Sequence, residues 1–396
     1  MAQYLEEALA MREEIVAHRR YLHQHAELGF ELTETVAYVC KVLRSYGCEP
    51  RLLGGGVTCT IGQGTPVILL RADMDALPQE EQSGLDFACR DGACHPCGHD
   101  AHTSMLLAAA KLLKVHETEL AGTVKLCFQP AEELLKGSQA MIDAGILDDP
   151  KVDAAIGFHM NFGDNGYEDM RPGVLLYAEH QAMASADEFQ ITVKGASAHG
   201  STPFRGVSAA HVASAIVTAL QQLLPMEVDA GEQAILSVGS VHSGSAANIV
   251  PAEAVIKGSF RTFSPQARDY LRQRLPELAG GIASAWRAEA ETEYTIGVAP
   301  NVNDEALTQE MVRYASEVMK KVQVIKPVKG SEDFANLCGH VPTFFANICA
   351  GGVKEGYIYS MHNPKARLDE DALPYGAALH ATCAANWLSH HKSNAI

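Results

Sequence analysis

The chain has 396 residues, of which 47% are apolar and 20% charged, and its formal net charge is −17. This length favours two domains over a single core. The negative charge argues against nucleic acid and anionic membrane surfaces as partners, but it is compatible with small anionic substrates. We see no signal-peptide pattern and no apolar run as long as a membrane span, so we expect no membrane association and a cytoplasmic location. The 10 cysteines show no disulfide spacing pattern, which favours reduced thiols.

The first part of the chain predicts two helical pieces followed by two strands. Residues 3–47 look helical, with a break near His23, His25 and Gly29, and we interpret both histidines as exposed or capping. Strands are predicted at 56–61 and 67–71.

Two carboxylates follow the second of these strands, at Asp73 and Asp75. Open α/β sheets place their functional sites at the carboxyl ends of buried strands. A surface loop could also carry two aspartates, so this segment alone leaves both interpretations open.

A thiol and an imidazole stand two residues apart at Cys97 and His99, just before a predicted helix at 103–113. Asp100 is a plausible N-cap for that helix, and His102 could lie near His99 because the two are three residues apart. Thiolate and imidazole together suit zinc or a neighbouring first-row metal better than magnesium or calcium.

Two further strands end in residues that can bind metals or transfer protons. The strand predicted at 122–128 leads to Glu132 and Glu133, and the strand at 152–158 ends in His159. Neighbouring side chains on an extended backbone point in different directions, so one glutamate could bind a metal while the other acts as a general base. A helix at 137–144 separates the two strands. Alternatively, Glu132 and Glu133 could simply be the acidic start of a helix before Leu134, which is a common arrangement.

The pattern changes over residues 186–298, where strands and helices follow the order β-α-β-β-α-β. This order predicts an α+β unit of its own, related to the ferredoxin-like fold. The α/β pattern resumes afterwards, with a helix from Asp304, strands at 322–325 and 343–348, and a final helix at 370–388. We therefore predict a discontinuous catalytic domain at 1–185 and 299–396 with an inserted domain at 186–298.

Several segments, in this order along the chain, resemble the M20 metallopeptidase family, and specifically its amidohydrolases: aminoacylases, hippurate hydrolases and auxin-conjugate hydrolases. The resemblance covers nearly the whole chain. The segments are 22–31 (LHQHAELGFE), 71–78 (RADMDALP), 97–102 (CGHDAH), 128–133 (FQPAEE), 157–159 (GFH), 198–199 (AH), 248–251 (NIVP), 260–263 (FRTF), 330–334 (GSEDF) and 361–364 (MHNP).

The resemblance implies a zinc-peptidase-like α/β domain with a mixed sheet flanked by helices, and an inserted domain that acts as a lid and forms a homodimer. It implies two divalent metal ions per chain, which could be Zn, Mn, Co or Ni, and hydrolysis of an N-acyl amino acid. Glu132 would be the general base, Asp75 would orient a ligand imidazole, and His199 on the lid would polarise the carbonyl, commonly from the other subunit. The implied metal ligands are Cys97 as the bridge, His99, Glu133, His159 and His362, and the implied substrate contacts are Asn248 and Arg261.

The sequence departs from the family at several positions. Phe204 and Ser208 stand where a histidine and an aspartate are usual, which affects the lid side of the substrate site rather than the metal site. Ala26 replaces a common proline. Cys94 creates a Cys-x-x-Cys pattern with Cys97, and oxidation of this pair would remove the bridging ligand.

Three alternatives stay open at this point. The cysteine pair could mark a thiol–disulfide site, although such motifs normally open a helix in a smaller fold. The chain could be a binding or metal-storage homologue without catalysis, although that role needs neither Glu132 beside Glu133 nor His199. Within the hydrolases, a dipeptidase or an N-acetyl-diaminopimelate deacetylase is the alternative to an aminoacylase.

Overall fold

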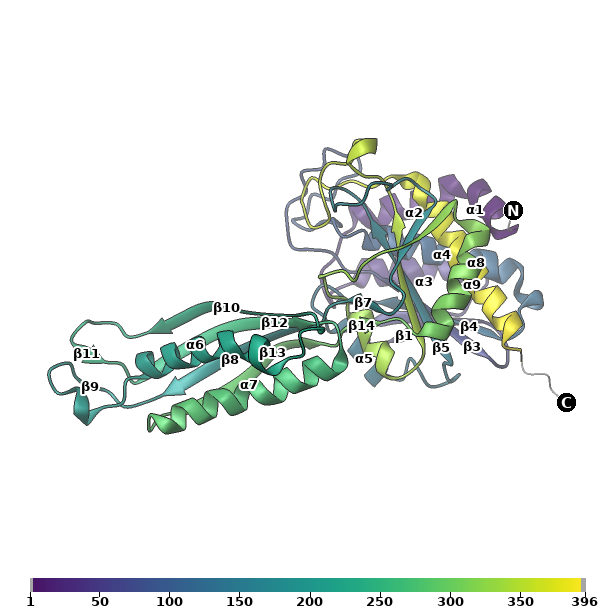
Figure 1. The fold of residues 1–396 in the computed structure, drawn as a ribbon. Coiled ribbons are helices and arrows are strands. Elements are labelled where there is room, and N and C mark those ends of the chain that lie inside the picture. Colours follow the sequence, from purple (N-terminus) through teal and green to yellow (C-terminus); the bar gives the residue numbers. More distant parts are fainter. Residues whose placement is uncertain (1–2, 393–396) are drawn as a thin grey trace. The chain divides into compact units, whose positions relative to one another are not determined.

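The computed structural model describes residues 3–392 and contains two compact units (Figure 1). The larger unit takes its described residues from Met1–Ala182, Val302–Lys326 and Asn336–Ile396. The smaller unit comprises Met183–Asn301 and Pro327–Ala335. Residues 327–335 were predicted to belong to the catalytic domain, whereas their contacts group them with the smaller unit.

The larger unit is built on a mixed sheet of eight strands, which confirms the predicted α/β class. Neighbours along the sheet are parallel at β4–β3, β3–β5, β5–β16 and β6–β15, and antiparallel at the other steps. In spatial order the strands are β1 (Arg51–Leu53), β2 (Gly56–Gly62), β4 (Thr123–Gln129), β3 (Val67–Asp73), β5 (Ala154–Asn161), β16 (Thr343–Cys349), β6 (Val174–Tyr177) and β15 (Lys321–Val324).

The three central strands β4, β3 and β5 bring their carboxyl ends together. Every residue in these strands is buried, as expected for parallel strands covered on both faces. Asp73 pairs in register with Gln129 on β4, and Arg71 with Gly157 on β5. The segments that follow β3 and β4, and the last residues of β5, therefore meet at one edge of the sheet.

Helices pack on this sheet, with α4 and α9 in contact with each other and with β3. The helices of the larger unit are α1 (Gln3–Ala10), α2 (Arg12–Gln24), α3 (Thr33–Ser45), α4 (His99–Val115), α5 (Gly137–Asp143), α8 (Glu305–Val318) and α9 (Leu373–His390). Short 3-10 helices lie at η1 (Glu117–Glu119), η4 (Val353–Glu355) and η5 (Glu370–Ala372).

The expectation that Asp100 caps α4 is wrong, because the helix begins earlier. Gly98 is the N-cap residue, with φ +92° and a Cβ position only 3.2 Å from the Phe162 ring, so a glycine fits there best. The Asp100 carboxylate instead accepts hydrogen bonds from Arg19 and His23, each at 2.8 Å.

His23 is buried, contrary to the expectation of an exposed or capping residue. Its ring lies between two carboxylates, 2.8 Å from Asp100 and 3.0 Å from Glu81, and joins α2 to the start of α4. His25 does stand at the C-cap of α2, where its Nδ1 donates to the Tyr21 carbonyl.

The smaller unit has the predicted β-α-β-β-α-β order. Its antiparallel sheet is ordered β10-β12-β8-β13, and α6 and α7 pack on one face over an apolar core (Figure 1). The elements are β8 (Ala186–Lys194), β9 (Ala198–His199), η2 (Pro203–Arg205), α6 (Ala209–Glu227), β10 (Ala234–Ser243), β11 (Ile249–Val250), β12 (Glu253–Thr262), α7 (Pro265–Ala285) and β13 (Glu289–Val298). Three short elements, β7 (Gln181–Met183), β14 (Asn301–Val302) and η3 (Asp333–Gly339), span positions where the chain passes between units.

Among the described residues, α6 is the one helix whose length and composition would allow it to cross a membrane, which the sequence analysis does not anticipate. Its apolar residues at Val212, Ile216, Leu220 and Leu223 recur every three or four positions and are buried in the core of the smaller unit. This spacing is that of an amphipathic helix packed on a sheet.

Candidate metal centre

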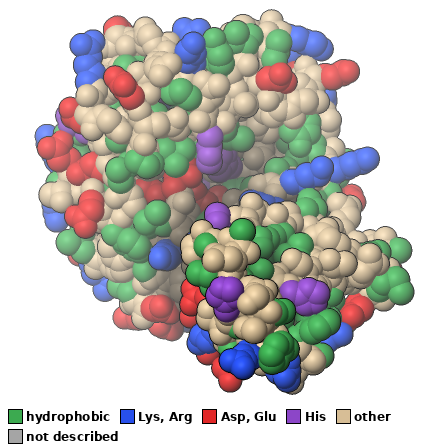
Figure 2. All heavy atoms as spheres, turned by 90° about the vertical axis from the view of Figure 1, so that its left-hand side faces the viewer, with side chains coloured by type: hydrophobic (Ala, Val, Ile, Leu, Met, Phe, Trp, Pro, Cys, Tyr) green, Lys and Arg blue, Asp and Glu red, His purple; other side chains and the backbone are tan. Residues whose placement is uncertain are grey.

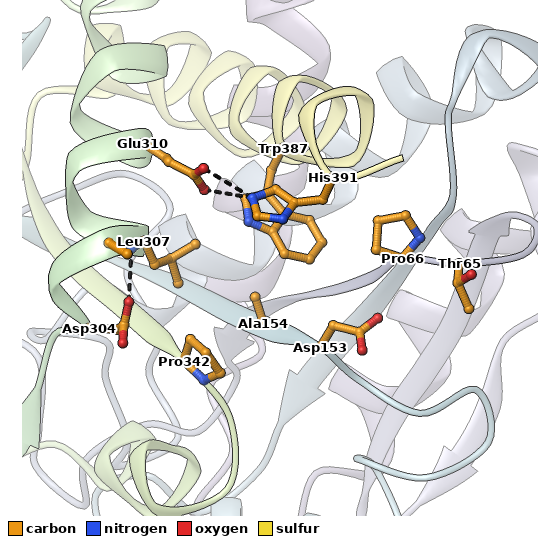
Figure 3. A pocket seen from close by; sticks show the side chains of 11 residues that line it. Thr65, Pro66, Asp153, Ala154, Asp304, Leu307, Glu310, Pro342, Trp387 and His391 are labelled. Carbon is orange, nitrogen blue, oxygen red and sulfur yellow. Dashed lines mark hydrogen bonds and ion pairs between the residues drawn. The ribbon is translucent and has the colours of Figure 1, made fainter. Parts of the chain in front are cut away.

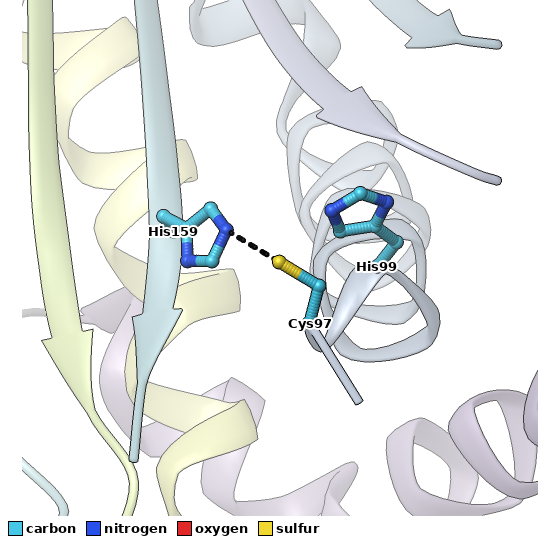
Figure 4. Close-up of side chains that lie close together, drawn as sticks. All are labelled: Cys97, His99 and His159. Atoms are coloured by element: carbon cyan, nitrogen blue, oxygen red, sulfur yellow. Dashed lines mark hydrogen bonds between the residues drawn. The ribbon is translucent and has the colours of Figure 1, made fainter. Parts of the chain in front are cut away.

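Seven of the predicted site residues gather at the carboxyl edge of the central strands of the larger unit. On the face of this unit shown in Figure 2, histidine and acidic side chains lie close together. Cys97 and His99 come from the loop before α4 and from its first residue, and His159 comes from β5 (Figure 4). Asp75, Glu132 and Glu133 follow β3 and β4, and His362 lies in a loop after β16.

The Cys97 sulfur lies where two groups of potential ligands overlap. It is 3.5 Å from Nε2 of His159 and 3.2 Å from Nε2 of His362 (the first contact is drawn in Figure 4). The donor atoms of Cys97, His99 and His159 all lie within 4.8 Å of one another, and so do those of Cys97, Glu133 and His362. A sulfur shared by two such triads is well placed to bridge two metal ions.

His99 presents one ring nitrogen to this cluster. Its Nδ1 donates to the backbone carbonyl of Asp75 at 2.8 Å, which leaves Nε2 unprotonated in the neutral ring. That Nε2 is buried and has no hydrogen-bond partner, and the same is true of Oε1 of Glu133, 4.0 Å away. Buried polar atoms are normally satisfied, so a cation between these two would supply the missing partner.

His159 is oriented in the same way. Its Nδ1 donates to its neighbour's carbonyl, that of Met160, at 2.7 Å, so Nε2 faces Cys97. His102 does not present a nitrogen to the cluster: its Nδ1 lies 2.6 Å from Asp73, and its Nε2 accepts the Met160 N–H at 2.7 Å. His102 therefore positions the end of β5 that carries His159.

The carboxylate of Asp75 positions the two glutamates. One oxygen accepts the Glu132 N–H at 2.9 Å and the other accepts the Glu133 N–H at 3.1 Å. Its backbone carbonyl, rather than its carboxylate, accepts the His99 imidazole, whose Nδ1 is 3.6 Å from the nearest carboxylate oxygen. The main-chain carbonyl of Asp75, rather than its carboxylate, therefore orients the His99 imidazole. The carboxylate is already occupied by the N–H groups of Glu132 and Glu133.

The charges in the cluster favour a bound cation. Burial, and then the Glu133 carboxylate, raise the pKa of the Cys97 thiol well above its ordinary value. Burial opposes a charge on His99, but Asp73 and Cys97 raise the pKa of this imidazole well above its usual range. Divalent cations would supply the positive charge that a thiolate and several carboxylates need in a buried place, so the donor set fits a pair of metal ions of the zinc class.

The backbone is strained at two positions beside the cluster. His362 has φ 66° and Ala131, just before Glu132, has φ 51°, in the left-handed region that non-glycine residues rarely adopt. The His362 N–H donates to the Pro96 carbonyl at 3.0 Å, which ties this loop to the one that carries Cys97. Strained residues of this kind concentrate at functional sites.

No disulfide joins Cys94 to Cys97. Cys94 is buried, exchanges backbone hydrogen bonds with Leu77, and has its thiol pKa raised to about 12 by burial. A reactive thiol normally has a lowered pKa, so the thiol–disulfide alternative is not supported.

The other predicted site residues lie in the smaller unit, and the structure separates them into two places. His199 on β9 and Asn248 beside β11 are neighbours, because the Gly200 N–H donates to the Asn248 carbonyl at 2.7 Å. Arg261 lies near the other end of β12 and donates to Ser331 at 2.5 Å and to the Lys329 carbonyl at 3.3 Å. At about 3.3 Å per residue, β12 alone spans about 30 Å between these places.

Ser208 and Phe204, which stand where the family usually has an aspartate and a histidine, have different surroundings in the structure. Ser208 is the N-cap of α6, with its hydroxyl accepting the His211 N–H. Phe204 is 75% exposed in η2, on the same side of the smaller unit as His199.

Asp73 and His102 support the cluster from beside it; the sequence assigned no role to Asp73, and it predicted for His102 only a position near His99. Asp73 lies 3.6 Å from Nε2 of His99 and is paired with the buried Arg71 at 2.7 Å, and His102 is its other partner. Their signals were present, since Asp73 ends the buried strand β3 and His102 lies three residues after His99.

Comparison with known proteins agrees with this geometry. The model of peptidase family M20/M25/M40 matches residues 69–386. N-acetyl-L-cysteine deacetylase of Bacillus subtilis is 36% identical over 92% of this chain and 85% of its own length. IAA-amino acid hydrolase ILR1-like 4 of Arabidopsis thaliana is 32% identical over 96% of this chain and 87% of its own length. The structure of the Bacillus subtilis YXEP protein, described as a dinuclear metal binding peptidase, superposes with a TM-score of 0.81 at 30% identity and covers 96% and 99% of the two chains.

The cluster and these relatives define a metal-dependent amidohydrolase. The chain belongs to peptidase family M20/M25/M40.

Proposed function

We propose that this enzyme hydrolyses the amide bond of N-acyl amino acids. The observation that carries the proposal is the placement of Glu132 and Glu133 on one segment beside a thiol and three imidazoles, with both backbone N–H groups fixed by Asp75. The deacetylase and the auxin-conjugate hydrolase among the relatives support an acyl amino acid as the substrate.

Two divalent metals, of the Zn, Mn, Co or Ni class, would be held by the five predicted ligands. Cys97 would be shared, with His99, Glu133, His159 and His362 completing the site. When bound, such metals lower the pKa of a water and polarise an amide carbonyl.

Glu132 is the general base in this proposal. It is buried, and one carboxylate oxygen lies 3.8 Å from Nε2 of His99, next to the proposed ligands. Its carboxylate accepts the proton of the attacking water and later delivers it to the nitrogen of the leaving amino acid.

His199 and Arg261 would contact the substrate from the smaller unit. The exposed imidazole of His199 would stabilise the charge that develops on the carbonyl oxygen, and Arg261 would bind the substrate carboxylate. Since about 30 Å of strand separates their positions, one small substrate cannot reach both within one smaller unit. This distance supports a homodimer in which His199 serves the active site of the other chain.

The test is a panel of substrates assayed by released amine. N-acetyl, N-benzoyl and indole-acetyl derivatives of several amino acids would be compared with dipeptides and N-acetyl-diaminopimelate. The proposal expects cleavage of N-acyl amino acids with kcat/KM above that for dipeptides. Cleavage of dipeptides alone would contradict it, as would no cleavage by protein that contains its metals.

A further inference from the structure

A second group of metal-binding donors lies in the larger unit, where α8 and α9 pack together. Glu310 on α8 faces His390 and His391 at the end of α9. Nδ1 of His390 is 3.0 Å from one oxygen of Glu310, and Nε2 of His391 is 3.0 Å from both. The three donor atoms lie within 4.8 Å of one another, and none belongs to the metal centre described above.

The surrounding residues restrict two of these donors, Glu310 and His391, while the His390 side chain is 55% exposed. The His391 ring stacks on the Trp387 ring with a centroid distance of 4.5 Å and an interplanar angle of 23°. The Glu310 side chain is only 19% exposed, so neighbouring atoms restrict the orientation of its carboxylate. Figure 3 shows His391 over Trp387 with its ring directed at the Glu310 carboxylate.

A pocket of about 600 Å³ opens beside this group. Glu310, His391 and Trp387 line it together with Asp153 and Asp304, and no lysine or arginine is among the lining residues. An acidic pocket favours a cation, and it would leave room for water as a further ligand.

The chemistry of the three donors selects the class of cation. Two imidazoles and one carboxylate suit zinc, copper, nickel or cobalt, whereas calcium and magnesium prefer oxygen ligands alone. Donors at about 2.0–2.1 Å from a tetrahedral zinc are about 3.3 Å apart, so the observed 3.0 Å contacts need to widen by only a few tenths of an ångström.

We propose that Glu310, His390 and His391 form a further transition-metal site, separate from the catalytic cluster. A metal bound there joins the end of α9 to α8, and so stabilises the packing of the last helix of the chain. The ordinary alternative is a pair of histidine–glutamate hydrogen bonds that bind no metal.

The experiment measures Zn²⁺ per chain after equilibrium dialysis of the metal-loaded enzyme against buffered micromolar Zn²⁺. Wild type is expected to bind one more Zn²⁺ per chain than either Glu310→Gln or His391→Ala. His340→Ala removes an exposed histidine elsewhere in the larger unit and should bind as much as wild type. Amide hydrolysis measured on the same samples should be equal in all four proteins, which shows that the catalytic metals are still bound.

A second measurement separates loss of binding from loss of folding. Added Zn²⁺ should raise the melting temperature of wild type and of His340→Ala, but not that of the Glu310 and His391 variants. Each variant should still unfold in a single cooperative transition without added metal, which shows that it is folded. Equal Zn²⁺ content in wild type and both variants would overturn the proposal, as would a Zn²⁺-dependent rise in melting temperature that both variants retain. These outcomes do not depend on which amide the enzyme cleaves.

Discussion

The sulfur of Cys97 is the atom that the two triads of donors share. Its distances of 3.2 and 3.5 Å to two imidazoles place it between them, while its buried position raises its pKa when no metal is present. A bound cation would therefore favour the thiolate in this place, and metal binding would release the thiol proton.

Cys97→Ser should lower the metal content, because a serine hydroxyl is a much poorer bridging ligand than a thiolate. Metal per chain, measured after dialysis against metal-free buffer, should fall well below that of wild type. Cys94→Ser is the matched control, since it changes a buried thiol three residues away that contacts no proposed ligand, and its metal content should equal wild type. Full occupancy in Cys97→Ser would show that another group makes the bridge.

Asp75→Asn should reduce activity about 10–100-fold, the usual effect of a group that orients metal ligands. Both carboxylate oxygens accept backbone N–H groups, and the asparagine amide can accept only one of them. The kcat/KM of the variant would be compared with that of wild type. Its circular dichroism spectrum should match that of wild type, which shows that the variant is folded. Activity equal to wild type would mean that the Glu132–Glu133 segment is positioned without Asp75.

Much of the larger unit's site could be predicted at the residue scale, because Cys97 and His99 precede a long helix, and Glu133 and His159 follow or end buried strands. His362 was predicted only through the resemblance to the M20 family. The orientations of the His99 and His159 imidazoles could not be predicted. They depend on carbonyl groups of Asp75 and Met160, which carry no signature in the sequence. Asp100 was misassigned for a related reason: its partners Arg19 and His23 are about 80 residues away along the chain.

At the scale of elements, three parallel strands and one helix start determine the site. Buried apolar runs predicted β3, β4 and β5 directly, and their shared carboxyl edge followed from the rules of α/β sheets. The short strands β1 and β6 were missed, although the equally short β15 was predicted at 322–325, because runs of three or four residues carry little periodicity and are recognised only in some cases. The pairing of β16 between β5 and β6 joins residues far apart in the chain, and only the folded structure shows it.

Helix α9 contains a histidine that should make stability sensitive to acid. Neither ring nitrogen of His380 has a hydrogen-bond partner, the side chain is fully buried against the Phe158 ring, and burial, with a contribution from His102, lowers its pKa to about 3. In the unfolded chain the ordinary histidine pKa is about 6.5. Between these two values the unfolded state binds the proton first, so stability is lost as the pH falls from about 6.5 towards 3.

His380→Leu should remove this contribution. Below pH 6.5, protonation of His380 in the unfolded state lowers the free energy of unfolding of wild type by an amount that approaches about 1.4 kcal/mol per pH unit. The variant has no such loss. The free energy of unfolding of both proteins would be measured by denaturant titration at pH 7.5, 6.5 and 5.5. The stability of the variant relative to wild type should rise as the pH falls, and a constant difference across these pH values would contradict the assignment.

At the scale of the whole molecule, the proposed dimer determines whether the active site is complete. His199 and Arg261 lie near opposite ends of a strand of about 30 Å, so the account assigns them to different active sites. Sequence analysis could suggest the inserted unit from its β-α-β-β-α-β order. The sequence did not show where His199 lies relative to Arg261, because that depends on the pairing of β9 with β11.

Mixing two inactive variants tests this arrangement. His199→Ala and Glu132→Gln chains, each inactive alone, would be unfolded and refolded together, and the activity would be compared with refolded wild type. If His199 acts across a two-fold dimer, half of the randomly formed dimers are mixed and each contains one intact site, so about a quarter of the activity should return. If mass measurement demonstrates mixed dimers and no activity returns, His199 acts in the active site of its own chain.

Removal and replacement of the metals in wild type and in a Glu132 variant test whether Glu132 drives amide hydrolysis at a metal centre. Release of amine from the best N-acyl amino acid would be measured for wild type and Glu132→Gln before chelation, after chelation, and after re-addition of Zn²⁺, Mn²⁺ or Co²⁺, with metal content determined in parallel. We expect wild-type activity to be lost and then restored by at least one metal, while Glu132→Gln rebinds as much metal and stays several orders of magnitude less active. Wild-type activity that survives complete removal of the metals, or a Glu132→Gln variant as active as wild type, would contradict it.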